Sequence, residues 1–72
     1  MNIRSKIRLF VDTPLGEGQS ILLDRDQANY LFNVMRLNIG DYISVFNGKD
    51  GEWQADVLHA NKRKGILVAK YQ

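Results

Sequence analysis

The amino-acid sequence predicts a mainly β fold, a small barrel of about five strands with one α-helix. Several short apolar segments are separated by turns rich in glycine and asparagine, and one amphipathic segment begins at a capping residue. The 72 residues leave room for one domain. A content of 44% hydrophobic and 25% charged residues is typical of a globular chain. Barrel closure is favoured because it removes the edges that short strands otherwise expose.

The N-terminal third predicts two strands joined by a loop. Residues 8–12 alternate, with Ile7, Leu9 and Val11 on one side. A loop is expected at residues 13–18, which contain the only proline and two of the six glycines. The apolar residues 21–23 form the second predicted strand.

An α-helix is predicted at about residues 25–36, ending at Met35 or Leu37. Asp24 is a good N-cap, and Gln27 completes a capping-box pattern. The residues expected on the core-facing stripe are Ala28, Leu31, Phe32 and Met35. On the opposite, polar face the helical period places Arg25, Asn29 and Arg36, with Asn33 beside them.

The C-terminal half predicts three further strands. Residues 42–46 are rich in β-branched and aromatic side chains, and residues 47–51 have the asparagine and glycines of a hairpin connection. Residues 52–57 alternate, so that Trp53, Ala55 and Val57 are expected to face inward. A basic turn at residues 61–65 leads into the last strand at residues 66–71.

The cations concentrate at the two ends of the chain. They are Arg4, Lys6 and Arg8 near the N-terminus, and Lys62, Arg63, Lys64 and Lys70 near the C-terminus. If the two segments meet in space, they form one basic patch of the kind that binds nucleic acid through its phosphates. The alternative is that each short run of charge only solvates a turn.

The sequence contains no group of residues typical of a catalytic site. The chain has no cysteine and one histidine, which excludes disulfides, thiol nucleophiles and Cys/His metal sites. His59 has no nearby nucleophile or second metal ligand, and no helix follows Gly16-x-Gly18 as a dinucleotide loop requires. We expect no catalysis by this chain alone. No stretch approaches the ~20 apolar residues of a membrane helix, and we expect neither a signal peptide nor a location outside the cytoplasm.

The polar helix face predicts RNA binding. Arg25 and Arg36 can each make bidentate contacts to phosphate, and the two asparagines can contact base edges or sugar hydroxyls. Tyr30 lies away from the apolar stripe and can stack on an unpaired base. The predicted RNA-binding residues are Arg36, Arg25, Asn29, Asn33, Tyr30, Arg8, Lys6, Arg4, Lys62, Arg63 and Lys64. The alternative is a solvated helix face without a ligand.

Four motifs, in order, resemble a known family. They are Arg8-Leu9-Phe10-Val11, then Asp24-x-x-Gln27-Ala28-Asn29-Tyr30-Leu31-Phe32-Asn33-Val34-Met35-Arg36-Leu37-x-x-Gly40-Asp41, then Val45-Phe46-Asn47-Gly48, and Gly51-Glu52-Trp53-x-Ala55-Asp56-Val57. Over nearly the whole chain this pattern is similar to the N-terminal part of the RsmE family. Members use S-adenosylmethionine to methylate N3 of a uridine in 16S ribosomal RNA.

The resemblance implies a PUA-like β-barrel of about five to six strands with one α-helix, and an RNA-binding domain spanning residues 1–72. Family members join this barrel to a SPOUT methyltransferase domain, which binds the cofactor, forms the homodimer and is expected to be absent here. The implied partner is 16S ribosomal RNA or the small ribosomal subunit, with no cofactor in this fragment and no membrane. Arg36 matches the family pattern, whereas Tyr30 stands where members commonly have a histidine.

Two other functions remain open from the sequence. One is a protein-interaction or dimerisation barrel, and the other is an OB-like or SH3-like module of a translation protein. An OB-like or SH3-like module would have a charge distribution similar to that of this chain, but it would not have the motif of residues 24–41.

Overall fold

Five β-strands and one helical segment make up the fold of the computed structural model, which describes residues 7–61 and 63–72. Arg4, Lys6 and Lys62 therefore lie outside the described residues. The strands are β1 Arg8–Phe10, β2 Ser20–Leu23, β3 Tyr42–Phe46, β4 Glu52–Asn61 and β5 Lys64–Tyr71. All five predicted strands are confirmed, although β1 ends two residues early and β4 continues four residues further than expected.

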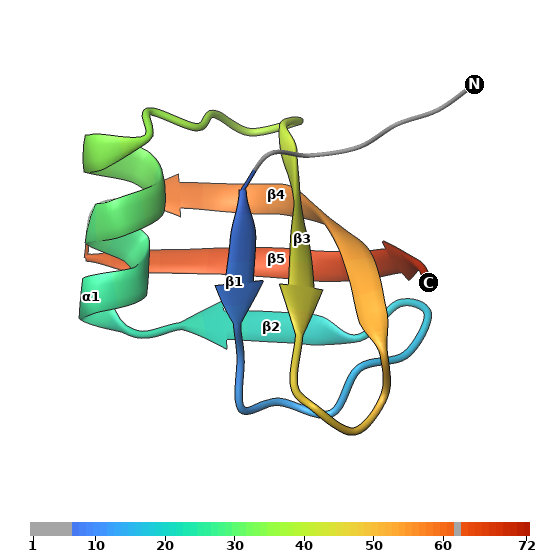
Figure 1. Cartoon of the computed structure of the whole chain (residues 1–72). Helices are drawn as coiled ribbons and strands as arrows, with labels where there is room; N and C mark the ends of the chain where they lie inside the picture. The colour runs from blue at the N-terminus through green and yellow to red at the C-terminus, as the bar shows by residue number, and fades with distance from the viewer. Residues whose placement is uncertain (1–6, 62) are drawn as a thin grey trace.

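The strands form one curled sheet in the order β1-β3-β4-β5-β2. β1 pairs with β3 in parallel, and the other neighbours are antiparallel. The sheet bends so that β1 and β3 cross over β4 and β5, and the helix stands at one end of this half-barrel (Figure 1). The mainly β prediction is confirmed, but the barrel stays open because β1 and β2 are the two ends of the sheet.

The core lies inside the curl of the sheet. Alternate residues point inward, as in β3, where Ile43 and Val45 are fully buried. Ala55 and Val57 are buried as predicted, and Trp53 packs partly buried against the same cluster. No polar or charged residue is buried among the described residues, so the polar groups available for binding all lie at the surface.

The helical segment begins as predicted and then changes its winding. Asp24 accepts a hydrogen bond from Gln27 N at 2.7 Å, and Gln27 Oε1 accepts one from Asp24 N at 3.0 Å, so the capping box is present. The α-helix α1, Arg25–Ala28, continues as a π-helix, Asn29–Val34. In it, hydrogen bonds span five residues, as from Met35 N to Tyr30 O at 2.9 Å.

The end of the helix corrects two predictions. The helix stops at Val34, so Arg36 follows it and has a left-handed backbone with φ 59°. Met35, predicted in the core, is 40% exposed. A π-helix turns less per residue than an α-helix, so a stripe drawn with the α-helical period does not continue to position 35. Ala28 and Leu31 are fully buried as expected, and Phe32 packs against the core.

One polar cluster joins the loop after β1 to the β3–β4 hairpin. The Asp50 carboxylate accepts from the backbone N–H of Leu15 at 3.0 Å and from the Asn47 amide at 2.8 Å. The same amide donates to Thr13 O at 2.9 Å. The Asp50 carbonyl accepts from Trp53 Nε1 at 2.8 Å. Both the backbone and the side chain of Asp50 therefore hold this hairpin in place.

Candidate nucleic-acid interface

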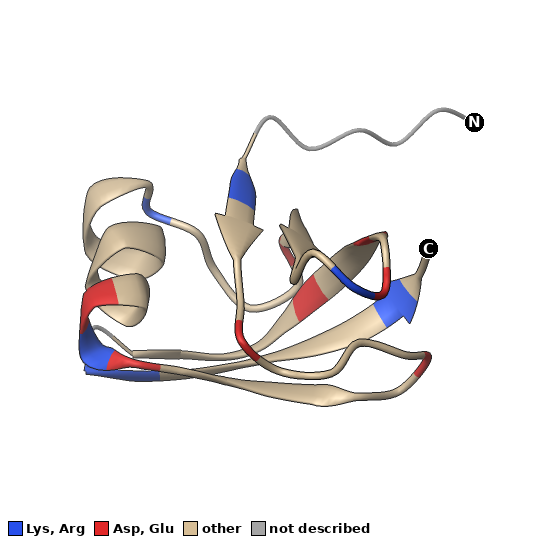
Figure 2. Ribbon diagram, turned by 60° about the horizontal axis from the view of Figure 1, so that its bottom comes forward, with Lys and Arg blue, Asp and Glu red and all other residues tan. Residues whose placement is uncertain are grey.

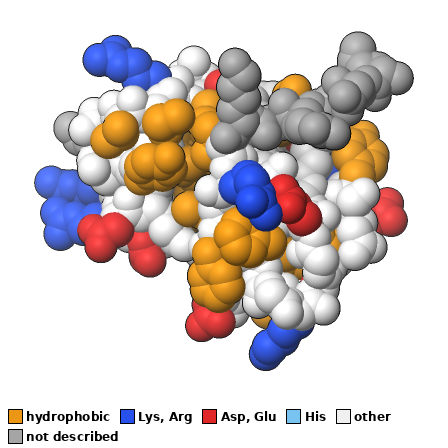
Figure 3. All heavy atoms as spheres, in the orientation of Figure 1, with side chains coloured by type: hydrophobic (Ala, Val, Ile, Leu, Met, Phe, Trp, Pro, Cys, Tyr) orange, Lys and Arg blue, Asp and Glu red, His pale blue; other side chains and the backbone are white. Residues whose placement is uncertain are grey.

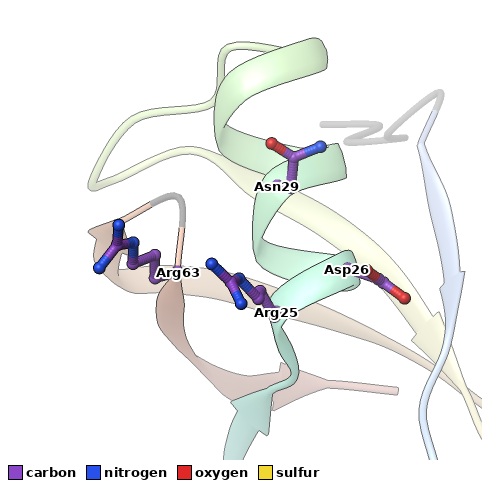
Figure 4. Close-up of a pocket in the computed structure, with 4 residues that line it drawn as sticks. All are labelled: Arg25, Asp26, Asn29 and Arg63. Carbon is purple, nitrogen blue, oxygen red and sulfur yellow. The ribbon is translucent and has the colours of Figure 1, made fainter.

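A basic pocket lies where the start of α1 meets the turn between β4 and β5. It is lined by Arg25, Asp26, Asn29 and Arg63 and has a volume of about 320 Å³. Arg25 extends from the helix toward Arg63 on the turn, and Asn29 stands further along the same side of the helix (Figure 4). The structure thus brings together three of the residues predicted from the sequence, from segments 34 or more residues apart.

Gly65 explains why the helix comes so close to the β4–β5 turn. A Cβ atom at this buried position would collide with the ring of Phe32, so only glycine leaves room for that ring on β5. Gly65 lies two residues after Arg63, and Phe32 lies seven residues after Arg25. The contact therefore packs the helix that carries Arg25 against the strand that follows Arg63. Sequence reasoning placed Gly65 only in a turn, because its packing partner is distant in the chain.

The two guanidinium groups of the pocket are available to a ligand. Both arginines are exposed, and the ion pair found within residues 7–61 and 63–72 lies elsewhere, between Arg8 and Glu52. Asp26 points away from Arg63 (Figure 4). Acidic and basic positions alternate at the start of the helix, while the β4–β5 turn is basic (Figure 2). The Arg63 side of the pocket is therefore the side that attracts anions.

An asparagine pair continues the polar face along the helix. Asn33 Nδ2 donates to Asn29 Oδ1 at 3.2 Å, and both residues are exposed. The predicted neighbourhood of Arg25, Asn29 and Asn33 is therefore present, although the second half of the helix is π-helical. Tyr30, also on this helix, is 42% exposed.

Arg36 is exposed and follows the helix directly, at the end opposite the pocket. Its left-handed backbone is held from both sides, because Met35 N bonds to Tyr30 O and Leu37 N bonds to Leu31 O at 3.0 Å. Basic side chains project beside both ends of the helix, whereas apolar side chains gather on the visible face of the helix and of β1 (Figure 3).

Arg8 was predicted as a cation available to RNA, whereas in the structure its side chain has partners within the protein. Its guanidinium makes two hydrogen bonds to the Glu52 carboxylate, at 3.0 and 3.1 Å, and lies 4.9 Å from the centre of the Phe46 ring. Phe10 meets Phe46 edge to face at 5.8 Å and is 53% exposed. Arg8 is thus held on the sheet by a carboxylate and a ring.

In the order of the sheet, β3 and β4 lie between β1, which carries Arg8, and β5, which carries Lys64. Arg8 is opposite Ser44, and Ser44 is opposite Gln54. Gln54 pairs with Tyr71 at the last residue of β5, whereas Lys64 is its first. One basic patch formed by both ends of the chain stays a prediction for Arg8, while Arg4, Lys6 and Lys62 lie outside the described residues.

Lys64 faces a second hollow, separate from the basic pocket. This hollow has a volume of about 290 Å³ and is lined by His59, Asn61, Lys64 and Ile66. His59 is exposed near the end of β4. Within residues 7–61 and 63–72, no group of three or more acidic or histidine side chains is placed to hold a metal ion. No helix in this part of the chain has the length and apolar character needed to cross a membrane.

Comparison with known proteins identifies the family. The profile described as RNA methyltransferase PUA domain matches residues 23–70. The ribosomal RNA small subunit methyltransferase E of Rickettsia conorii is 32% identical over 66 residues, which are 90% of this chain and 27% of that protein.

Solved structures share the fold. A methyltransferase from Legionella pneumophila, in complex with S-adenosylmethionine, matches with a TM-score of 0.82 at 22% identity, over 96% of this chain and 28% of that one. Ribosomal RNA small subunit methyltransferase E from Neisseria gonorrhoeae, bound to S-adenosylmethionine, matches with a TM-score of 0.76 at 22% identity, over 89% and 26%. The chain spans about a quarter of the length of these relatives. Because the family profile covers most of the sequence, this chain belongs to the RNA methyltransferase PUA domain family.

Proposed function

We propose that this chain is an RNA-binding accessory domain, which holds 16S ribosomal RNA while a separate domain of the parent protein methylates a uridine at N3. That separate domain would bind S-adenosylmethionine and form the homodimer, in the cytoplasm. The present chain contributes positioning, which raises the effective concentration of the reacting groups. The resemblance to ribosomal RNA small subunit methyltransferase E supports the choice of RNA.

One observation carries the proposal: Arg25 and Arg63 converge on one pocket from distant segments. Neither has a carboxylate partner in the described part of the chain. Each guanidinium offers a planar set of donors that matches the oxygens of a phosphate. Two unpaired arginines on one pocket are typical of a surface that binds the backbone of a nucleic acid.

The test is a titration of labelled small-subunit ribosomal RNA, followed by fluorescence anisotropy at several salt concentrations. The variant Arg25→Ala/Arg63→Ala should bind more weakly. The negative slope of log K against log salt should become less steep by about 0.7 for each phosphate contact that is lost. Lys49→Ala, an exposed lysine of the β3–β4 hairpin, is the matched control.

Two results would contradict the proposal. One is equal binding by the double variant and the unmodified chain. The other is the absence of salt-dependent RNA binding together with a concentration-dependent dimer in sedimentation, which would favour a protein-interaction barrel.

A further inference from the structure

The asparagine pair of the helix presents amide donors and acceptors together at the surface. The bond from Asn33 Nδ2 to Asn29 Oδ1 uses one amide group of each residue. The Asn29 Nδ2 group and the Asn33 Oδ1 atom take no part in this bond. A donor beside an acceptor is complementary to a hydroxyl, which can both accept and donate.

The position of the pair links it to the basic pocket. Asn29 lines the pocket together with Arg25 and Arg63, so the asparagine pair begins at the pocket that carries the two arginines. In RNA, the 2′-hydroxyl of each ribose lies next to the phosphate on its 3′ side. DNA has the same phosphate without the hydroxyl.

We propose that the asparagine pair contacts the ribose 2′-hydroxyl next to a phosphate held by Arg25 and Arg63, so that this helix face distinguishes RNA from DNA. The inference rests on the proposed RNA-binding function and assigns it a chemical basis for selectivity. The arginines supply affinity that RNA and DNA share, and the amides supply the difference between them.

The hydrogen bond within the pair favours a hydroxyl over a base edge as the ligand. An asparagine that reads adenine needs both its oxygen and its nitrogen for the same base. Asn29 Oδ1 already accepts from Asn33 Nδ2, so this bond fixes the orientation of the Asn29 amide and leaves one lone pair of its oxygen for such a contact. In addition, A-form RNA displays its 2′-hydroxyls in a wide, shallow minor groove that is open to an exposed helix.

The experiment compares three hairpins of one sequence, made of RNA, of DNA and of 2′-O-methyl RNA. The 2′-O-methyl RNA keeps the ribose and the phosphates of RNA, but its 2′ oxygen has no hydrogen to donate. The unmodified chain should bind the RNA about two- to tenfold more tightly than either of the others, as expected for one net hydrogen bond. In Asn29→Ala/Asn33→Ala the three affinities should become equal, while the affinity for DNA stays within twofold. Asn38→Ala, an exposed amide after the helix, should keep the preference.

The outcomes separate this inference from the proposed function. If the unmodified chain binds none of the three hairpins, the proposed function fails. If it binds all three equally and Arg25→Ala/Arg63→Ala weakens all of them, phosphate binding stands and the hydroxyl contact is overturned. A preference for RNA that persists in the asparagine variant also overturns the hydroxyl contact.

Discussion

The ring of Phe32 lies so close to Gly65 that a Cβ atom built on the glycine would collide with Cε2 and lie 2.8 Å from Cζ. This contact joins the π-helical half of the helix to β5. It has a structural consequence, because Gly65 is buried in the core region and a larger residue must displace the ring. It also bears on function, because the same contact packs the helix that carries Arg25 against the strand that follows Arg63.

Gly65→Ala should therefore destabilise the protein by about 1–3 kcal/mol, the usual cost of adding a methyl group to a packed site. Urea denaturation monitored by circular dichroism measures this change. Gly16→Ala is the control, since a Cβ there would have nothing within 4 Å. Equal stability of the two variants would show that the ring moves aside without cost.

Asp50 should make stability depend on pH at the acidic end. Hydrogen bonds from the Leu15 backbone N–H and then from the Asn47 side chain, with a smaller effect of Lys49, hold the pKa of Asp50 below its ordinary value. Burial opposes this shift. A carboxylate with a lowered folded-state pKa stabilises the fold above its unfolded pKa, and the stabilisation is lost as the pH falls below about 4.

Asp50→Asn should flatten this part of the profile, which thermal denaturation between pH 2 and pH 7 would reveal. Glu17→Gln, an exposed residue of the loop after β1, serves as the control for general loss of negative charge. If both variants keep the slope of the unmodified chain, other carboxylates cause it.

The contrast between Arg8 and Arg25 predicts different effects on RNA binding. Arg8 is already bound to Glu52, whereas Arg25 has no such partner in the described chain. Arg25→Ala should weaken RNA binding more than Arg8→Ala does, in the same anisotropy titration at moderate salt. The Arg8 pair is exposed, and removing it should cost about 0.2–1 kcal/mol of stability. A larger loss of RNA affinity for Arg8→Ala would place the interface on β1.

These cases show which features the sequence could predict. Strands and the capping box depend on neighbours in the chain, so alternation and the pair Asp24 and Gln27 identified them. The partner of Arg8 is 44 residues away, and no local pattern indicates it. The π-helix was missed because the segment begins as a capped α-helix, and only the later hydrogen bonds distinguish the two kinds of winding.

Arg36 occupies a backbone conformation that usually belongs to glycine. Its φ of 59° is the left-handed value found after helix ends, where a side chain costs about 1–2 kcal/mol. The left-handed turn allows Leu37 N to bond to Leu31 O, but the Arg36 side chain is exposed and has no ion-pair partner among the described residues. An arginine in this position is expected where its side chain is needed for binding.

Arg36→Gly should consequently raise stability by up to about 1 kcal/mol, because relief of strain exceeds the extra entropy of glycine in the unfolded chain. The same variant should bind RNA more weakly and lower the salt slope by about 0.7. Arg36→Ala, which keeps the strained backbone, should lose the same affinity without the gain in stability. Thermal denaturation and anisotropy on both variants separate the two effects. Full RNA affinity in Arg36→Gly would mean that the arginine makes no contact with RNA and that its strain has another cause.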